Sequence, residues 1–479
     1  MNLLLALVTA AGMCGPQGDY VPGTVIVKWR DGPRVMQHGR LEHRFRSGAE
    51  KWRVEVPVLE AVEELRQRAD VEYAEPDYIV TVDLRPNDPY MVGFLQNGDT
   101  SSHMQNLRDD QPPDADISAE QAWDIETGDP SVVIADIDTG IDYRNPDLAG
   151  KLWTNPGEIP GDGIDNDGNG YVDDVHGYDF DNEDGDPLDD NGHGTHTAGT
   201  AAAATNNGIA VAGVCWGCSI MPLKFLSCGG SGTTSDAIRA IDYAAKMHAP
   251  IANNSWGGGG FSQALFDSIA GFTAGGGLFV ASAGNNARNT DLSPAYPADY
   301  DLPGIISVAA TDPNDALATF SNWGPLSVDL AAPGVLVNST WRVKDCRKQG
   351  ILDKDCVGSL SGTSMSAPHV SGAAGLLLSH DPTMTAAEMK AALLSSVDPV
   401  AALAGKSVTG GRLNAFKALG GGAPPQPTEF CGNDLCAPAE SCKTCEDDCL
   451  RIRNPRKSRT CCGDGRIDPG DPLNCAGDP

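Results

Sequence analysis

The sequence predicts an α/β protein in which a parallel sheet is sandwiched by helices. Four short, almost wholly apolar runs follow one another along the central chain, interspersed with helix-like segments at residues 236–246 and 366–378. The runs are residues 132–135, 219–221, 278–281 and 305–308. Such runs are typical of strands buried on both faces, and their alternation with helices is typical of parallel sheets. Functional side chains of these sheets collect at the carboxyl ends of the strands.

Composition narrows the possible partners. The 479 residues include 65 acidic and 34 basic ones, a formal net charge of -31, so nucleic acid and anionic membrane surfaces are not expected partners. Hydrophobic residues make up 41% of the chain, which is ordinary for a folded protein, and the length allows about three domains. We expect a monomer.

The first 15 residues predict a secretory signal peptide, because an apolar run is followed by small residues. The run is too short to span a bilayer, and no Lys or Arg precedes it. Secretion is therefore the expected localisation. The alternative is a surface lipoprotein anchored to the membrane by a lipid on Cys14, although Met13 stands where a small residue is expected.

Residues 22–84 predict a small α+β module. Residues 24–29 and 52–56 alternate as half-buried strands do, and Leu59, Val62 and Leu65 lie on one helical face. Residues 85–116 are rich in Pro, Asp and Asn, which indicates a linker open to proteolytic processing. A second domain covers residues 86–420, and a Gly/Pro hinge at 421–429 separates it from a disulfide-rich tail module at 430–479.

Three motifs lie at predicted strand or helix ends and together supply an acid, an imidazole and a hydroxyl. They are residues 136–142 (DIDTGID), 191–197 (NGHGTHT) and 362–369 (GTSMSAPH). Acyl transfer at neutral pH needs this set, since a serine becomes nucleophilic when a neighbouring histidine takes its proton and a carboxylate orients that histidine. The chain order Asp, His, Ser is that of subtilisin.

Each motif also has a simpler explanation. Asp136 and Asp142 flank the candidate acid, and an Asp before Thr-Gly is commonly a turn residue. His196 and His369 fit structural histidines better than bases, and the serine of the third motif could be a helix N-cap.

With these motifs the sequence resembles the subtilisin-like serine proteases (subtilases), near their thermitase-like branch. The resemblance covers residues 24–418. It implies that Asp138, His193 and Ser364 form the catalytic triad, and that Asn285 donates its amide to the oxyanion beside the backbone N–H of Ser364. It also implies that residues 22–84 are a propeptide that assists folding and inhibits the enzyme.

The resemblance further implies the substrate-binding residues. Residues 254–258 (NSWGG) are similar to the edge strand that pairs with an extended substrate, with Gly257 leaving room for it. The implied binding set is Ser255, Trp256, Gly257, Ala283, Gly284 and Ala295, of which Ala295 would form the floor of the S1 pocket. A small uncharged floor favours large apolar or mixed P1 residues.

A calcium site is predicted in the acidic segment 162–174 (DGIDNDGNGYVDD). Asp165, Asp167 and Asn169 alternate as the first ligands of an EF-hand-type loop do, followed by Gly170 and the backbone carbonyl of Tyr171. Position twelve is His176 instead of Glu, so Asp173 or Asp174 would close the ligand shell. A solvated acidic turn is the alternative.

A second calcium site is implied by the resemblance alone. Residues 86–90 (PNDPY) resemble the mature start of thermitase-like enzymes, which places the new N-terminus just before Asn87. The implied ligands are Asp88, Asp147, Thr205, Asn207, Ile209 and Val211.

The 14 cysteines fit an oxidising compartment. Cys346 and Cys356 are expected to close a loop, and Cys215 with Cys218 a local disulfide, with redox chemistry or half of a zinc site as alternatives for this C-x-x-C pair. Cys228 is then expected to be a buried free thiol. In the tail, disulfide-stapled repeats are expected and a zinc ribbon is the alternative.

The sequence therefore predicts a secreted, calcium-stabilised serine endopeptidase that is made as a zymogen and acts on proteins or peptides through an acyl-enzyme. The competing hypothesis is an inactive subtilase fold that serves as a calcium-dependent binding or adhesion protein.

Overall fold

The structure, a computed structural model, describes residues 20–30, 39–82, 115–207 and 209–421. Several predicted features lie outside these ranges: the signal peptide at 1–15 with Cys14, most of the 85–116 segment with Asp88, and the tail at 430–479 with nearly all of its hinge. Among the described residues, no helix is long and apolar enough to cross a membrane.

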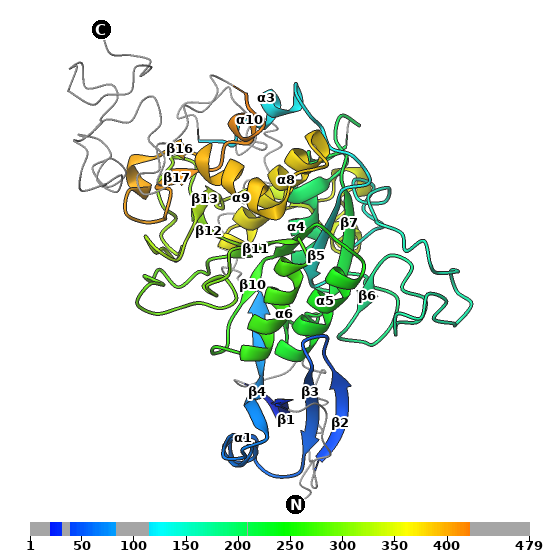
Figure 1. The fold of residues 1–479 in the computed structure, drawn as a ribbon. Helices are drawn as coiled ribbons and strands as arrows, with labels where there is room; N and C mark the ends of the chain where they lie inside the picture. Colours follow the sequence, from blue (N-terminus) through cyan, green and yellow to red (C-terminus); the bar gives the residue numbers. More distant parts are fainter. Residues whose placement is uncertain (1–19, 31–38, 83–114, 208, 422–479) are drawn as a thin grey trace, which may run out of the picture. The chain divides into compact units, whose positions relative to one another are not determined.

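A nine-stranded sheet forms the centre of the described chain from residue 115 onward (Figure 1). Its order is β16 (Asp398–Pro399), β17 (Gly411–Arg412), β13 (Leu330–Pro333), β12 (Ile305–Thr311), β11 (Leu278–Ser282), β9 (Ile251–Asn254), β5 (Val133–Asp138), β7 (Ser219–Lys224) and β6 (Tyr178–Asp179). All neighbours are parallel except β16 with β17. The predicted apolar runs correspond to β5, β7, β11 and β12, which confirms the predicted sheet.

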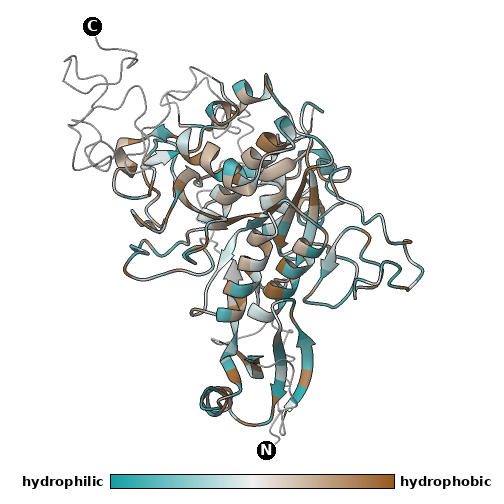
Figure 2. Ribbon diagram, in the orientation of Figure 1, coloured by the Kyte–Doolittle hydropathy of each residue, from teal (hydrophilic) through white to brown (hydrophobic). Residues whose placement is uncertain are grey.

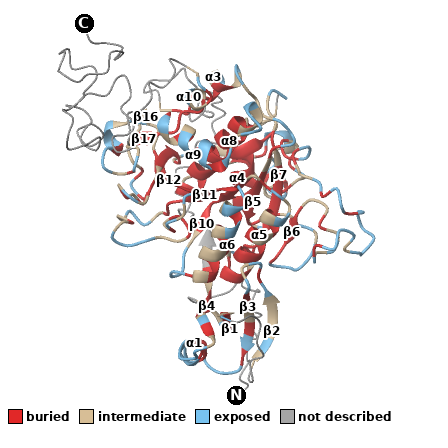
Figure 3. Cartoon of the chain, viewed as in Figure 1, coloured by how far each residue is buried: buried red, intermediate tan, exposed pale blue. Residues whose placement is uncertain are grey.

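Helices cover both faces of this sheet. One face carries α4 (His193–Ala202), α8 (Thr363–His380) and α9 (Ala386–Ser395), and the other carries α5 (Thr234–Lys246) and α6 (Gln263–Ala274). Successive strand residues enter opposite cores: Leu278 and Val280 pack with the first group, Phe279 and Ala281 with the second. The central strands are therefore buried along almost their whole length and are largely hydrophobic, with polar residues toward the carboxyl ends of β5 and β9 (Figures 2 and 3).

Smaller elements surround the sheet. They are α3 (Ala119–Trp123), α10 (Ala415–Ala418) and the hairpin of β14 (Val337–Thr340) and β15 (Val357–Leu360). The loop of this hairpin contains α7 (Val343–Lys348) and the 3-10 turn Asp353–Asp355, and a second 3-10 turn, Ala401–Leu403, follows later in the chain. The Cys346–Cys356 disulfide closes the hairpin loop, and Cys215 is bonded to Cys218, as predicted. Cys228 is disulfide-bonded. The expectation of a free thiol at Cys228 is therefore wrong, because it rested only on pairing the cysteines nearest in sequence.

The N-terminal module forms a separate antiparallel sheet with its own core. Its elements are β1 (Tyr20–Trp29), β2 (Gly39–Arg44), β3 (Ala49–Val54), α1 (Val58–Arg66) and β4 (Val71–Val82). Val25, Trp52 and Val62 pack together in this core. The predicted strands overlap β1 and β3, although β3 ends two residues before the predicted residue 56, and the predicted helix overlaps α1.

Candidate active site

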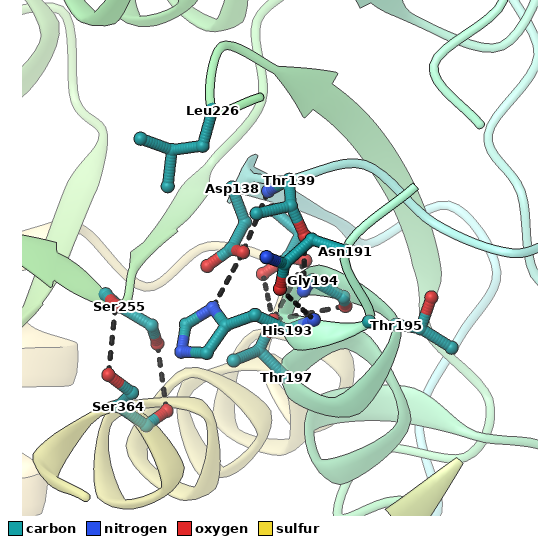
Figure 4. A network of polar contacts seen from close by, with 12 residues as sticks. Asp138, Thr139, Asn191, His193, Gly194, Thr195, Thr197, Leu226, Ser255 and Ser364 are labelled. Carbon is teal, nitrogen blue, oxygen red and sulfur yellow. Dashed lines mark hydrogen bonds and ion pairs between the residues drawn. The ribbon is translucent and has the colours of Figure 1, made fainter. Parts of the chain in front are cut away.

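Two of the predicted catalytic residues meet at the carboxyl end of β5. Asp138 is the last residue of β5 and His193 the first of α4, and both side chains are fully buried. Nδ1 of His193 lies 2.7 Å from Oδ1 of Asp138 (Figure 4). The same oxygen accepts the backbone N–H of Thr139 at 2.7 Å. The carboxylate thus orients the ring, with the proton of the neutral imidazole on Nδ1.

A glycine allows α4 to approach β5 this closely. A Cβ on Gly194 would lie 2.2 Å from the carbonyl oxygen of Gly140, so a side chain there would push the helix away. The Gly194 N–H instead donates to Thr139 Oγ1 at 2.8 Å. Asp189, which the sequence reasoning missed, holds the preceding loop by accepting the N–H of Gly192 at 2.8 Å and that of Thr195 at 3.0 Å.

Ser364 lies at the start of α8, on the Nε2 side of the His193 ring (Figure 4). Its hydroxyl donates to the carbonyl oxygen of Ser255 at 2.9 Å, and the Ser255 hydroxyl donates to the carbonyl oxygen of Ser364, also at 2.9 Å. Nε2 of His193 is buried and has no hydrogen-bond partner within the described chain. The nitrogen is therefore available to accept a proton when the serine hydroxyl rotates.

Asn285 follows β11 and is joined to the start of α8. Its Oδ1 accepts the backbone N–H of Thr363 at 2.9 Å and the Thr363 hydroxyl at 3.1 Å. The N–H of Gly284 donates to the same hydroxyl at 3.0 Å. These bonds fix the acceptor end of the Asn285 amide, so its NH₂ end is directed to the opposite side.

Two further buried histidines resemble His193 in sequence but differ in environment. Burial lowers the pKa of His196 to about 3 and that of His369 to about 4. Both rings bond to backbone carbonyls, His196 to Val337 at 3.0 Å and His369 to Met365 at 2.7 Å. Both therefore stay neutral at physiological pH.

The predicted edge strand exists and is already paired. β10 (Trp256–Gly257) runs antiparallel to the end of β4, with Trp256 opposite Val82 and Gly257 opposite Thr81. The segment after Ala295 lies against this strand, because the carbonyl of Tyr296 accepts the N–H of Gly258 at 3.1 Å. Ala283 and Gly284 are joined to the α8 side of the site instead, since Gly284 bonds to Thr363.

A second strand flanks β4 on its other side, and the sequence reasoning missed it. β8 (Ser231–Thr233) pairs antiparallel with β4, with Thr233 opposite Ile79 and Ser231 opposite Thr81. Three residues of Ser, Gly and Thr carry no periodicity that predicts a strand. The end of β4 therefore lies between two strands of the larger domain.

The acidic loop brings the predicted ligands Asp165 and Asp167 together and adds Glu158. Carboxylate oxygens of Glu158, Asp165 and Asp167 lie within 4.8 Å of one another. Asp174 is buried nearby and accepts the Asn169 amide at 2.7 Å. The Tyr171 side chain packs against Tyr178, Phe180 and Tyr243, which fixes its backbone within the loop. Glu158 was missed because it precedes the recognisable loop pattern.

These residues fit a hard cation. Oε2 of Glu158 and Oδ1 of Asp174 are buried without a hydrogen-bond partner in the described chain, although buried carboxylate oxygens are normally satisfied. An all-oxygen donor set of this kind suits calcium better than transition metals. His176 does not join the cluster, since its Nδ1 bonds to the carbonyl of Trp153 at 2.9 Å.

Part of the second implied cage also comes together. Asp147 accepts the Asn207 amide at 2.8 Å and the N–H of Val211 at 3.0 Å. Ile209 donates its N–H to Asn207 Oδ1 at 2.8 Å, and the Thr205 hydroxyl donates to the carbonyl of Ala203 at 3.2 Å. Since Asp88 lies outside the described residues, its place in this cage stays a prediction.

Comparison with known proteins identifies the family. The sequence profile of the subtilase family (Peptidase_S8) matches residues 129–422. The chain is 33% identical to a thermophilic serine proteinase of Bacillus sp. (strain AK1), over 84% of this chain and 88% of that protein. It is 38% identical to thermitase of Thermoactinomyces vulgaris, over 63% of this chain and 93% of that protein.

A solved structure supports the fold. Fervidolysin of Fervidobacterium pennivorans, a keratinolytic enzyme related to subtilisin, superposes with a TM-score of 0.64 at 23% identity, over 86% of this chain and 63% of its own. The family match, the relatives and the shared fold lead to one conclusion: the chain belongs to the subtilase family and is a serine endopeptidase.

Proposed function

We propose that this serine endopeptidase acts through Asp138, His193 and Ser364, and that it is secreted as a zymogen. The observation that carries the assignment is the buried 2.7 Å contact between Asp138 and Nδ1 of His193, with Ser364 on the other edge of the ring. Disulfides in the described chain and the predicted signal peptide support secretion.

The chemistry follows from this geometry. The Ser364 hydroxyl turns from the Ser255 carbonyl to Nε2 of His193, which takes its proton as Oγ attacks the substrate carbonyl. The Asp138 carboxylate stabilises the imidazolium. The Asn285 amide and the Ser364 N–H hold the oxyanion. His193 then protonates the leaving amine, and water hydrolyses the acyl-enzyme by the same steps in reverse.

A serine-directed phosphonate tests this assignment. Treatment of the activated enzyme is expected to stop casein hydrolysis and to add one phosphonyl group, located on Ser364 by peptide mass spectrometry. Ser366, two residues away in the same motif and bonded to the Ala332 carbonyl at 2.9 Å, is the internal control and should stay unmodified. An adduct on another residue, or activity that survives full labelling, would contradict the triad.

Residues 22–84 act in this proposal as an inhibitory propeptide. β4 pairs with strands of the protease domain, and in addition two carboxylates of the propeptide cap helices of that domain. Glu75 accepts the N–H of Gln263 at 2.7 Å and that of Ala264 at 3.0 Å at the start of α6. Asp77 accepts the N–H of Ser235 at 2.8 Å at the start of α5. Negative charge at helix N-termini is stabilising, so both contacts support docking.

This role predicts a defined cleavage and a stable product complex. β4 ends at Val82, opposite Trp256, and the neighbouring residue Ser255 bonds to Ser364, so the described strand ends close to the proposed nucleophile. N-terminal sequencing of the processed enzyme should therefore give a start between residues 84 and 87. The cleaved propeptide should co-elute with the enzyme in gel filtration, and the double variant Glu75→Ala/Asp77→Ala should lose this co-elution.

Glu64→Ala, an exposed position on α1, is the matched control and should leave the complex intact. Co-elution that persists in the double variant would show that the caps contribute nothing to docking.

Calcium is proposed as the structural ion of the acidic loop. Glu158, Asp165 and Asp167 would hold it, with Asp174, the Asn169 side chain and the Tyr171 carbonyl completing the oxygen set. A bound calcium ion would neutralise the repulsion among these carboxylates and rigidify the loop. The cage around Asp147, with Asn207 and Val211, is proposed as a second, separate site.

A further inference from the structure

One buried acid beneath the proposed triad has no part in the mechanism above. Asp136 lies two residues before Asp138 on β5, so both side chains are on the same face of the strand. It is 1% exposed. Asn253 of β9 donates its amide to Asp136 Oδ1 at 2.8 Å, and Thr197 of α4 lies with its hydroxyl oxygen 3.0 Å from Oδ2.

The hydrogen-bond donors and acceptors around Asp136 fit a protonated, neutral carboxyl group. The Thr197 hydroxyl lies within bonding distance of two acceptors, since the Gly194 carbonyl is 3.1 Å away. A hydroxyl has one proton and cannot serve both. If Asp136 carries a proton on Oδ2, it donates to Thr197, and Thr197 donates to Gly194. The neutral acid thus keeps both hydrogen bonds of Asp136 and adds one from Thr197 to the Gly194 carbonyl, which also belongs to the backbone hydrogen bonding of α4.

The charged surroundings favour the same state. No salt bridge joins Asp136 to a Lys, Arg or His in the described chain, and Lys224 on the neighbouring β7 pairs with Asp179, Asp181 and Asp190 instead. Burial and the nearby carboxylates of Asp138 and Asp189 raise the pKa of Asp136 well above its usual range. The histidines on the helices that cover this face are His193 and His196 of α4 and His369 and His380 of α8; His196 and His369 are neutral, and His380 is exposed at the last residue of α8.

The bonds of Asp136 connect the elements that carry the proposed triad. Through Thr197 it reaches the carbonyl of Gly194, the residue after His193. Through Asn253, whose amide also lies 3.2 Å from the Ser255 hydroxyl, it reaches the Ser255–Ser364 pair. One side chain on β5 thus links the first turn of α4 to the start of α8.

We propose that Asp136 is a positioning residue, kept as a neutral carboxylic acid, that sets the placement of His193 relative to Ser364. It adds no charge to the Asp138–His193 pair. The inference rests on the roles proposed above for His193 and Ser364.

Two substitutions separate the hydrogen bonds of Asp136 from its charge. Asp136→Asn keeps an acceptor for Asn253 and a donor for Thr197, and should leave kcat close to wild type with the acidic limb of the pH profile of kcat/KM unmoved. Asp136→Ala removes both bonds and should lower kcat about 10- to 100-fold, with KM little changed, since small displacements of reacting groups cost this much.

Two results would overturn the proposal. If Asp136 were ionised, losing its charge would lower the pKa of His193, and the acidic limb of the Asn variant would move about one pH unit lower. Full activity of the Ala variant would show that the bonds position nothing.

A stability measurement keeps the test independent of activity. A carboxyl whose pKa is raised by folding keeps its proton in the folded chain while the unfolded chain has lost its own above about pH 4. The free energy of unfolding therefore falls as pH rises toward the folded pKa. The Asp136→Asn variant has no titrating group at this position. Its melting temperature should therefore rise relative to that of the protein with Asp136 as the pH is raised from 5 to 8.

This comparison uses the full chain in a Ser364→Ala background, which prevents self-digestion. A melting-temperature difference that stays constant with pH would show that Asp136 is ionised in the folded protein. Failure of the triad assignment would show separately, as an active Ser364→Ala enzyme or a phosphonate adduct elsewhere.

Discussion

Replacing Ser364 by alanine is expected to lower kcat for peptide hydrolysis about 10⁶-fold, because it removes the proposed nucleophile while the fold keeps its buried packing. The triad acts as a unit, so adding His193→Ala to Ser364→Ala should cost little more. The full-length variant should also keep residues 22–84 attached, as read from its intact mass, because the cut after β4 is made by the same site.

An uncut propeptide would by itself inhibit the enzyme and hide any activity. The variant should therefore first be cleaved in trans by a trace of wild-type enzyme. Its progress curves are then compared with those of the same trace of wild-type enzyme alone. Ser366→Ala is the matched control, since its hydroxyl contacts only the Ala332 carbonyl among the described hydrogen bonds, and it should process itself. A trans-cleaved Ser364→Ala enzyme with more than a trace of wild-type turnover would rule out the assignment.

Removal of calcium is expected to lower the melting temperature by about 6 °C. An ion present at about a thousand times its Kd contributes about 4 kcal/mol, and for a domain of this size, at about 2.1 cal/mol/K of unfolding entropy per residue, each kcal/mol shifts the melting temperature by about 1.5 °C. Without the ion, three carboxylates within 4.8 Å repel one another. The measurement is a thermal melt of the Ser364→Ala chain in excess chelator and after calcium is restored.

Two charge-matched variants locate the effect. Asp167→Asn should abolish the part of the melting-temperature shift that calcium binding at the acidic loop causes. Asp184 is an exposed acid outside the cluster, and Asp184→Asn should respond to calcium as the parent does. Magnesium should not substitute, because it demands a smaller octahedral site. Identical melts with calcium and with chelator would remove the ion from this loop.

The fold was predictable because its signals are local. Runs such as residues 278–281 are apolar at every position, and only a strand buried on both faces requires this. The candidate acid has a local signal too, since Asp138 ends the strand that continues from the apolar run at 132–135. The roles of the triad residues in catalysis remain predictions until the variants are measured.

Other features depend on contacts that no local pattern encodes. Glu158 joins Asp165 and Asp167 through the path of a loop, outside the EF-hand spacing. β8 is a strand because β4 lies beside it. In the sequence, Asp136 is only a neighbour of the candidate acid. Its proposed positioning role is visible only in the hydrogen bonds it makes with Thr197 and Asn253. For β8 and Asp136 the deciding partner is distant in sequence, and for Glu158 it lies outside the spacing of the recognisable loop pattern.

The position of β4 between β8 and β10 has a consequence for how activity would develop over time. On its proposed role, the first cut after β4 produces a peptide that is already seated on both flanking strands and is present in equal amount to the enzyme. Each newly made molecule would therefore be inhibited by its own cleaved propeptide. The onset of activity would then be set by destruction of the released segment, and because active copies perform that destruction, the activation curve should be sigmoidal and should steepen with enzyme concentration.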